Sequence, residues 1–371
     1  MTIDSKRPNA LFLYLGRIDF SFDGGVQKKI KAQIEALKHN GFAEVYSIIG
    51  DPADNYIIGD ETISKNMRLR ELRKEREFAL KVTRFIRDNN ISFIYCRYNY
   101  ANDIITGLIF QNLEKTGIKR VMEIPTYPYM GEVRGFPISK IQDMVCGFWI
   151  GMNLDKIVTF SKTKRIFNCP TIEISNGIDL HRIPVSARTP HNEFNFLAVS
   201  HFNARHGLDR FINGLAAYYR IHNDAKVNLL IASADDNDTI INAKRQVEKL
   251  GLSHNVHFLG FVGGKDLDRL FDICDMAVGS LARHREGIST LRTLKNTEYA
   301  ARGVAFTYSE SNPDFDNQPY VIRVPADETP IDIERLIKFK QDLDISPDEI
   351  RASVQNLSWD NQMARVLRSL S

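Results

Sequence analysis

The chain has 371 residues, 43% hydrophobic and 26% charged, a composition typical of folded globular proteins rather than disordered ones. Its formal net charge of +3 is too small for a dedicated nucleic-acid-binding protein. No segment approaches the roughly 20 apolar residues that a membrane span needs, and the N-terminal apolar run is too short for a signal peptide. The four cysteines form no CxxC pair, which favours a reducing compartment. We therefore expect a cytoplasmic protein, either soluble or peripheral on the inner face of the cell membrane.

Short apolar runs alternate with amphipathic stretches from the first residues onward, the pattern of parallel sheets with crossover helices. In the first half the predicted strands are 10–15, 44–49, 93–97, 120–124, 156–160 and 171–175. A polar segment with two prolines, 179–194, is predicted to be an interdomain linker. A second series of strands follows at 194–200, 226–232, 255–260, 275–280, 303–308 and 320–325, each expected to precede a helix.

This pattern predicts an α/β protein of two Rossmann-like, doubly wound parallel-sheet domains. The length of the chain is also the length expected for two hydrophobic cores. Such domains are expected to face each other across a cleft and to bind ligands outside the carboxyl ends of their strands. The C-terminal tail is predicted to form two helices, the first with Ser346 as N-cap, Pro347 as its first residue and Glu349 completing a capping box.

The segment REGISTLRTLKNTEYAARGVAF, residues 285–306, carries the most chemistry. It follows a predicted strand, so its helix begins where a parallel sheet offers backbone N–H groups to an anion. Ser289, Thr290 and Thr293 add hydroxyl donors, and Lys295 adds a positive charge. Glu298 can accept hydrogen bonds from two vicinal hydroxyls, as carboxylates do on a ribose. The alternative is an ordinary capped helix with a solvated lysine and glutamate.

Four ordered motifs resemble one protein family. GSLARHREGISTLRTLKNTEYAARGVAF (279–306), SNGIDL (175–180), LGFVGGKDLDRLFDICDMAVGS (259–280) and RHGLDRFINGL (205–215) are similar to the donor-site segments of GT-B nucleotide-sugar glycosyltransferases. The resemblance is to the retaining glycosyltransferase family four, of the type found in bacterial surface polysaccharide synthesis. Weaker similarity lies at DGGVQKKI (23–30) and EIPTYPYMGE (123–132).

The resemblance implies a fold and an activity. The GT-B fold would place an acceptor-side domain in residues 1–182, joined by a C-terminal helix at 359–371, and a donor-binding domain in residues 183–358. The activity would be a retaining hexosyltransferase that moves a sugar from a nucleotide diphosphate sugar, expected to be a UDP-sugar, to a saccharide or lipid-linked saccharide. No metal and no cofactor are expected, and no nucleic acid is an expected partner.

The sequence departs from the family pattern at two places. The family has two glutamates separated by seven residues, but the position that precedes Glu298 by this spacing is Thr290. Either Thr290 and neighbouring backbone amides fill the role of the missing glutamate at the donor sugar, which we favour, or a longer loop brings Glu286 to the site. Where the family has a lysine before a glycine, this chain has His206, so Arg205 is the better fixed positive charge. A pH-sensitive contact through His206 is a further expectation.

The predicted site falls into three groups. The catalytic group comprises Arg205, Lys295, Glu298 and Glu286. The donor-binding group comprises Gly24, Gly25, His206, Ser289, Thr290, Thr293, Leu294, Thr297 and Phe261. The acceptor-binding group comprises Glu123, Thr126, Tyr127, Tyr129 and Glu132, because aromatic rings cover the apolar faces of sugars and carboxylates accept from their hydroxyls. The alternative for the last group is a rigid structural loop.

The segment 65–90 contains nine Lys or Arg and four Asp or Glu. Leu69, Leu72, Leu80 and Phe85 are expected near one face of a helix, so the segment is a candidate for contact with anionic membrane. The commoner alternative is a solvated helix whose apolar face packs on the core.

Two other functions remain open from the sequence. A nucleotide-sugar epimerase of the same fold would release an altered sugar without an acceptor. A catalytically silent partner of a true transferase would explain the missing first glutamate.

Overall fold

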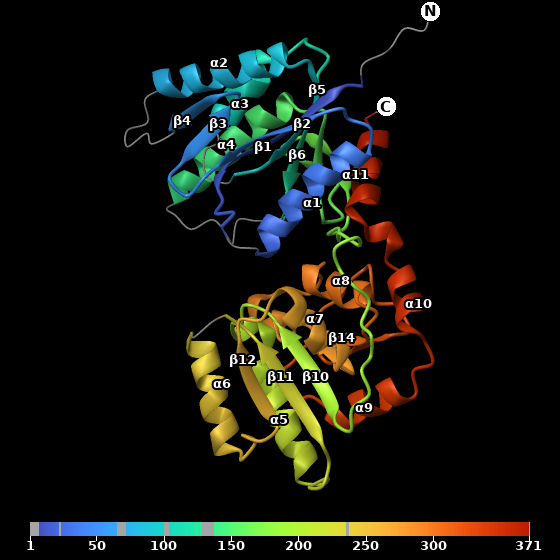
Figure 1. Ribbon diagram of the computed structural model, residues 1–371. Coiled ribbons are helices and arrows are strands. Elements are labelled where there is room, and N and C mark those ends of the chain that lie inside the picture. Colours follow the sequence, from blue (N-terminus) through green and yellow to red (C-terminus); the bar gives the residue numbers. More distant parts are fainter. Residues whose placement is uncertain are drawn as a thin grey trace, which may run out of the picture. The chain divides into compact units, whose positions relative to one another are not determined.

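The computed structural model describes residues 7–21, 24–64, 72–99, 104–125, 127, 137–234 and 237–370 (Figure 1). The chain divides into two compact units. Unit 1 comprises Met1–Ser175 and Trp359–Ser371, and unit 2 comprises Asn176–Ser358.

Unit 1 is built on a seven-stranded sheet with the order β2-β1-β5-β6-β7-β9-β8, in which the β8–β9 pair is antiparallel and the others are parallel. Parallel neighbours need crossover connections, most of which are helices here. Its elements are β1 (Asn9–Arg17), α1 (Gly25–His39), β2 (Val45–Gly50), β3 (Asn55–Ile58), β4 (Glu61–Ser64), α2 (Leu72–Asp88), β5 (Ile91–Arg97), α3 (Ile104–Asn112), β6 (Lys119–Ile124), α4 (Pro137–Met152), β7 (Lys156–Thr159), β8 (Arg165–Ile166), β9 (Cys169–Glu173) and α11 (Trp359–Arg368).

Both faces of this sheet are buried. Successive side chains of a strand point to opposite faces, and Leu11 and Leu13 belong to one core cluster while Ala10 and Phe12 belong to another. The first cluster is covered by α2, α3 and α4, and the second by α1 and α11 (Figure 1). The predicted doubly wound arrangement is confirmed for this unit.

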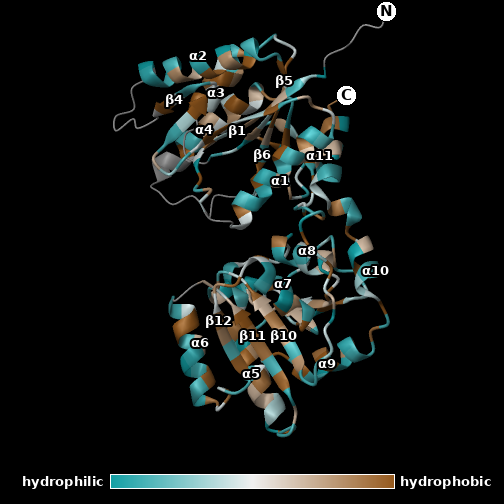
Figure 2. Ribbon diagram, viewed as in Figure 1, coloured by the Kyte–Doolittle hydropathy of each residue, from teal (hydrophilic) through white to brown (hydrophobic). Residues whose placement is uncertain are grey.

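Unit 2 is built on a six-stranded parallel sheet with the order β12-β11-β10-β13-β14-β15. Every residue of β11 is buried, and apart from Asn195 and Asn228 the residues of β10 and β11 are apolar, brown in Figure 2, as expected of parallel strands covered on both faces. Its elements are β10 (Phe194–Val199), η1 (Ala204–His206), α5 (Leu208–Tyr219), β11 (Val227–Ala232), α6 (Asp238–Lys249), β12 (Val256–Gly260), α7 (Gly264–Asp272), β13 (Met276–Val278), η2 (Arg283–Glu286), α8 (Leu294–Ala301), β14 (Phe306–Tyr308), β15 (Val321–Arg323), α9 (Ile333–Gln341), α10 (Pro347–Ala352) and η3 (Gln355–Leu357).

The capping box predicted for the C-terminal tail is present at the start of α10. The Ser346 side chain accepts from the backbone N–H of Glu349, whose carboxylate accepts from the backbone N–H of Ser346 at 2.8 Å. In contrast, the expectation that each strand precedes a helix is wrong for β14, because the connection from β14 to β15 contains no helix.

The segment predicted to be a linker packs on unit 2. Ser186 is buried; its backbone N–H donates to the carbonyl of Arg302 at 2.8 Å, and its hydroxyl donates to the carbonyl of Phe271 at 2.9 Å. The passage into unit 2 lies earlier, between Ser175 and Asn176. Residues 176–182, which we had assigned to the first domain, belong to unit 2, where the N–H of Ile178 donates to the carbonyl of Leu357 at 3.0 Å.

The apolar face of α2 differs from the predicted one. Leu80 is exposed, and the side chains of Leu69 and Leu72 lie outside the described set. Phe85 is partly buried against the core, 140° around a helix from Leu80 at about 100° per residue. The face that packs on the sheet consists of Phe78, Ala79, Val82 and Ile86. The proposed lipid-facing side of this helix is therefore not the apolar side.

Candidate functional site: a cation cluster in unit 2

The site begins at the topological switch point of unit 2. When its strands are numbered along the unit, their order is 3-2-1-4-5-6, so the connections after β10 and β13 leave two neighbouring strands in opposite directions. Ligands of open parallel sheets bind at such a point. The segments that follow these two strands carry Arg205 and Arg283, respectively.

Gly207 allows the two segments to approach each other. Its φ of +66° lies in the left-handed region, and a Cβ atom at this position would lie 2.9 Å from Cβ of Leu281. The close approach lets the backbone N–H groups of Leu281 and Ala282 donate to the carbonyls of His206 and Arg205 at 3.2 and 3.1 Å. Arg205 is thereby held beside the turn that contains Arg283.

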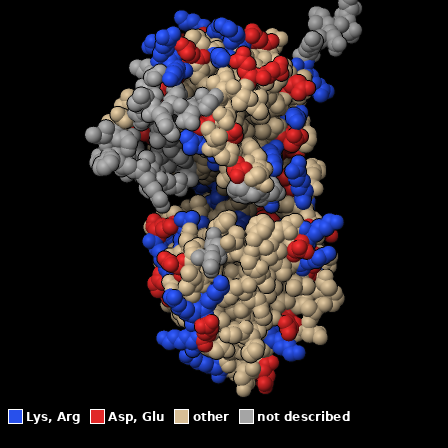
Figure 3. Space-filling view, turned by 60° about the vertical axis from the view of Figure 1, so that its left-hand side comes forward, with Lys and Arg blue, Asp and Glu red and all other residues tan. Residues whose placement is uncertain are grey.

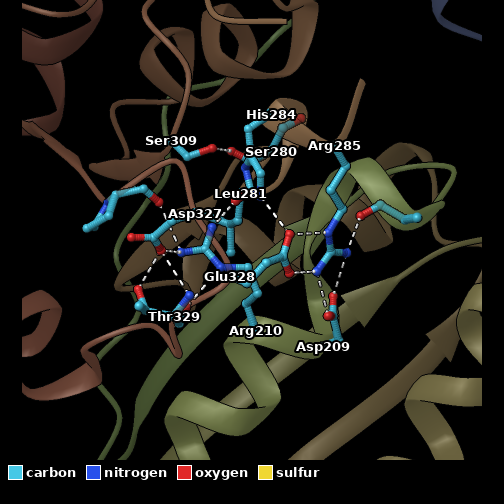
Figure 4. Close-up of polar contacts among 12 residues, drawn as sticks. Asp209, Arg210, Ser280, Leu281, His284, Arg285, Ser309, Asp327, Glu328 and Thr329 are labelled. Atoms are coloured by element: carbon cyan, nitrogen blue, oxygen red, sulfur yellow. Dashed lines mark hydrogen bonds and ion pairs between the residues drawn. The ribbon is translucent and has the colours of Figure 1, made fainter. Parts of the chain in front are cut away.

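A second network fixes that turn to the rest of the unit (Figure 4). The buried guanidinium of Arg210 donates to the backbone carbonyl of Leu281. Arg285 pairs with Asp209 at 2.7 Å and donates from Nε to Glu328 at 2.9 Å. These ion pairs anchor η2 to α5, so Arg285 is a structural residue although it lies only two positions from Arg283.

Three cations and two carboxylates meet at this place. Arg205 pairs with Glu286 at 3.1 Å, and Arg283 lies 3.8 Å from the other oxygen of Glu286. Lys295, in the first turn of α8, and Glu310, just after β14, complete the group. Electrostatic interactions link Lys295 to Arg283, Arg205 and Glu310. We call these five residues the cation cluster.

Lys295 is held in an unfavourable environment for its charge. Burial lowers the pKa of Lys295, the positive charges of Arg283 and Arg205 lower it further, and Glu310 raises it, with a result of about 7. Its ammonium donates to the hydroxyl of Ser200 at 3.3 Å. A bound anion would strongly stabilise the protonated form of this lysine.

His206 does not act as a pH sensor. Burial, followed by the charges of Lys295, Arg283 and Arg205, lowers the pKa of His206 to about 2, so the ring is neutral. Its Nδ1 accepts from the backbone N–H of Asn203 at 3.1 Å, and therefore Nε2 carries the hydrogen that faces Ser200 at 3.2 Å. The expected pH-sensitive contact through His206 is contradicted.

Glu310 is a site residue that the sequence did not suggest to us. It is 1% exposed, and within the described part of the chain no side chain donates a hydrogen bond to either of its carboxylate oxygens. Burial raises the pKa of Glu310, while its own backbone N–H, the charges of Arg283 and Lys295 and the backbone N–H of Ser309 oppose this effect. The backbone of Ser311 exchanges hydrogen bonds with Ser289 and Leu291, which brings this segment alongside Thr290. Glu310 is therefore adjacent in sequence to Ser311, which pairs with Thr290. Thr290 stands at the position where the family has its first glutamate.

The cluster also contains unpaired donors. Nε of Arg205 and Nε of Arg283 are buried and lack a hydrogen-bond partner among the described residues. Buried polar groups are normally paired, and exceptions mark strain or an absent ligand. Unpaired cationic donors beside a carboxylate that no described side chain donates to suit a ligand that carries both an anionic group and hydroxyl groups.

The remaining predicted donor residues lie around α8 and β12. Thr293 is the N-cap of α8, and its side chain accepts from the N–H of Asn296. Thr297 is buried and donates to the carbonyl of Thr293. Glu298 accepts twice from Arg302 at 3.0 Å, so its carboxylate is partly engaged. Ser289, Thr290 and Phe261 are exposed, whereas Leu294 is half-buried.

The predicted residues of unit 1 have different fates. Gly24 and Gly25 stand at the start of α1, as expected, with Gly24 as its N-cap. Thr126, Tyr129 and Glu132 lie outside the described residues, and the described Tyr127 packs against the core.

Glu123 is not placed to bind an acceptor. It is fully buried, it pairs with Lys29 at 2.9 Å and Arg97 at 2.8 Å, and it accepts from Tyr95 and Gln33 at 2.7 and 2.6 Å. Burial alone would raise the pKa of Glu123, but these cations and hydrogen bonds lower it to about 2. This carboxylate is a structural ion-pair centre rather than a sugar-binding group.

Comparison with known proteins places this geometry in a family context. Residues 181–303 match the family model of the glycosyl transferases group 1. This region contains four of the five cluster residues and the switch point itself. A search of curated proteins finds no match to this sequence.

Solved structures share the fold over the whole chain. They include a glycosyltransferase from Rickettsia africae, with 13% identity, 98% of both chains covered and a TM-score of 0.68. A sucrose-phosphate synthase from Thermosynechococcus elongatus has 17% identity, with 98% of this chain and 99% of that chain covered and a TM-score of 0.65. Anabaena HepE, solved in complex with UDP, has 14% identity, with 97% and 100% covered and a TM-score of 0.66. The fold is that of the GT-B glycosyltransferases.

The described residues were also compared with the requirements of metal sites and of membrane-spanning helices. They contain no group of three or more His, Cys, Asp or Glu side chains arranged to hold a metal ion. Over the same ranges, no helix combines the length and apolar character required to cross a bilayer.

Proposed function

We propose that this chain is a glycosyltransferase that moves a sugar from a nucleotide diphosphate sugar to a saccharide or lipid-linked saccharide acceptor. The observation that carries the proposal is the cation cluster at the switch point, where Arg205, Arg283 and Lys295 converge with unpaired or weakly paired donors. The match to the glycosyl transferases group 1 and the shared GT-B fold support it. UDP is the expected nucleotide, since UDP is bound in the structure of Anabaena HepE.

The cluster would act on the leaving group. The nucleotide diphosphate gains negative charge as its bond to the anomeric carbon breaks, and three fixed cations stabilise that charge more in the transition state than in the intact donor. The N-terminal turn of α8 would add backbone N–H groups from residues near Thr293. No metal or cofactor is required for this proposal.

Glu310 would recognise the transferred sugar. Among the described residues no side chain donates to its oxygens, which can accept hydrogen bonds from sugar hydroxyls while its charge faces Lys295 and Arg283. This assignment replaces our sequence-based choice of Thr290 or Glu286 for the missing glutamate. The exposed ring of Phe261 remains a candidate for stacking on the base.

Finer features follow from the family resemblance alone. We propose retention of anomeric configuration, transfer of a hexose and a role in bacterial surface polysaccharide synthesis. The NMR spectrum of the product gives the anomeric configuration of the new glycosidic linkage. The same configuration as in the donor would support retention, and inversion at the anomeric carbon would contradict it.

A ligand screen tests the central proposal. We expect calorimetric titration with UDP, GDP, ADP and their sugars to show binding of one nucleotide and its sugars. Arg283→Ala should weaken that binding by at least about tenfold, because a charge-assisted hydrogen bond contributes about 1.5–3 kcal/mol. Lys338→Ala, at an exposed position on α9 of the same unit, is the control and should leave affinity unchanged.

The products distinguish the alternatives. Release of nucleotide that depends on added acceptor supports transfer. Conversion of the donor to a different nucleotide sugar without acceptor would indicate an epimerase. Absence of binding by any nucleotide sugar would contradict the proposal and favour a silent partner.

A further inference from the structure

Helix α4 of unit 1 presents large apolar side chains to solvent. Ile141, Met144, Val145, Phe148 and Met152 on α4 are between 41% and 75% exposed. Their spacing of three, four, seven and eleven residues from the first places them on one side of the helix. A surface helix normally presents charged residues on this side.

The opposite side of α4 is fixed in the core. Gly147 and Gly151 face Phe167: a Cβ atom on Gly147 would lie 2.3 Å from its ring, and one on Gly151 would lie 2.4 Å from its backbone oxygen. Asp143 is also buried and accepts from the hydroxyl of Tyr98 at 2.8 Å. These contacts prevent the helix from rotating to bury its larger apolar residues. The exposed stripe is thus a fixed property of the fold.

A basic segment borders this stripe. Residues 161–168 include Lys162, Lys164 and Arg165, all exposed, and lead into Phe167, whose ring packs edge-on against Phe148 of the stripe. The sequence from 141 to 168 contains two carboxylates. Asp143 is buried, as described, and Asp155 accepts from the backbone of Arg120 at 2.8 Å and lies near the side chain of Lys119.

The same side of the sheet carries further positive charge. The core cluster that buries Ile150 of α4 also contains residues of α2 and α3, so the three helices form one layer. The exposed Lys and Arg of α2 outnumber its exposed carboxylates, Glu77 and Asp88. These cations are Arg73, Lys74, Arg76, Lys81, Arg84 and Arg87. Figure 3 shows blue side chains gathered at the top of unit 1, the height at which α2 lies in Figure 1.

We propose that the apolar stripe of α4 and the bordering basic residues dock unit 1 on a bilayer that contains anionic lipid. Apolar side chains flanked by Lys and Arg match the interface of such a bilayer, where acyl chains lie beneath negative headgroups. A second copy of the chain would bring the same cations together, and their repulsion opposes that arrangement. The inference does not rest on glycosyl transfer.

Vesicle sedimentation with the full-length chain tests the proposal. We expect binding to vesicles of phosphatidylcholine mixed with phosphatidylglycerol, and much weaker binding to vesicles of phosphatidylcholine alone. The double variant Val145→Ser with Phe148→Ser should reduce binding to the mixed vesicles by at least about tenfold, because apolar burial in the interface is lost. The double variant Lys162→Gln with Lys164→Gln should lessen the preference for phosphatidylglycerol.

Matched controls separate the stripe from exposed apolar residues in general. Ile57→Ser on β3 and Ile221→Ser in unit 2 remove side chains that are 65% and 75% exposed, and both variants should bind vesicles as the parent does. Circular dichroism checks that each variant is folded. Equal binding by the stripe variant and the parent, or no binding by the parent, would overturn the proposal. A dimer in solution that the stripe variant converts to a monomer would also overturn it, by identifying the stripe as a self-interface.

Discussion

Lys295 lies in an environment that disfavours its protonated form. The free protein holds the pKa of Lys295 at about 7, and only the cationic form attracts a diphosphate. Affinity for a nucleotide sugar should therefore be constant below pH 7 and weaken as the pH rises above 7, by up to about tenfold per pH unit. Calorimetric titration between pH 6 and 9 measures this, and the diphosphate diester of the ligand does not itself titrate in that range.

The matched variant is Lys295→Arg. A guanidinium remains charged over the whole range, so the variant should lose the pH dependence even if its geometry weakens binding overall. A parent profile that is flat to pH 9 would show that Lys295 does not contact the diphosphate.

Substitution of Glu310 should weaken binding of the nucleotide sugar without weakening binding of the nucleoside diphosphate. Glu310→Gln removes a negative charge beside the cations, so the nucleoside diphosphate alone should bind equally well or better. The corresponding nucleotide sugar should bind about tenfold more weakly, because a carboxylate acceptor is lost. Both titrations belong at pH 6 or below, because loss of Glu310 removes a group that raises the pKa of Lys295 and low pH favours the ammonium form. Parallel losses for both ligands would mean that Glu310 merely maintains the site.

The sequence identified some of these residues and not others for a physical reason. Arg205 and Lys295 occupy fixed offsets from strand ends, so motif spacing located them. Arg283 and Arg285 lie in the same turn and look alike in sequence, and only tertiary contacts with Asp209 and Glu328 make Arg285 structural. Glu310 follows a different strand, and its place beside Thr290 depends on the backbone contact through Ser311.

At the scale of elements, Glu123 joins three parts of unit 1. Its carboxylate at the end of β6 binds Lys29 of α1 and Arg97 of β5. Lys29 lies 4.1 Å from the centre of the Phe160 ring, so the network also reaches the end of β7. A strand end, a helix and two neighbouring strands are held together by one buried anion.

Glu123→Gln should destabilise unit 1 by about 3–5 kcal/mol, the usual cost of removing one partner from a buried ion pair. Because the pKa of Glu123 falls from its ordinary 4.5 to about 2 on folding, its contribution is complete above pH 4.5 and is lost as the pH falls towards 2. Urea unfolding at pH 7 and pH 3 measures both effects. The difference between variant and parent should shrink at pH 3.

Glu61→Gln is the comparison variant. Glu61 pairs with Lys81 at 2.9 Å on the surface, where solvent screening leaves an ion pair little effect on stability. Equal losses for the two variants would contradict the structural role of Glu123.

Periodicity predicted the elements better than their edges. The twelve predicted strands are all present, because buried parallel strands leave continuous apolar runs. The β3–β4 hairpin was missed, although Tyr56 and Ile58 alternate as buried residues and Gly59 at its turn has a φ of +62°. The linker was misplaced because prolines and polar residues also suit a segment that lies along a domain surface, as Ser186 and its neighbours do.

At the scale of the molecule, α11 follows unit 2 in the sequence but belongs to unit 1. Trp359, Met363 and Val366 are buried in the same core cluster as Ile30 and Leu37 of α1. Burial of each such side chain contributes about 1.5–3 kcal/mol. Their sum is comparable with the 5–15 kcal/mol that stabilises a typical domain.

A chain that ends at Ser358 should therefore retain a folded unit 2 and lose unit 1. Differential scanning calorimetry should show one transition in place of the two expected for the parent, and protease should digest the part before Ser175. The substitution Trp359→Ala in the full chain should destabilise unit 1 alone, by about 3–5 kcal/mol. Persistence of both transitions after truncation would show that α11 is dispensable.

The two crossings of the chain, after Ser175 and after Ser358, also set an order of events at the ribosome. Synthesis must pass through all of unit 2 before α11 emerges, which takes on the order of 10–40 s at about 5–20 residues per second. During that interval the apolar side chains of α1 that pack with Trp359 in the folded protein are left uncovered in nascent unit 1. Unit 1 can finish folding only after α11 has been synthesised, whereas unit 2 can fold before that, and chaperone dependence should concentrate on unit 1.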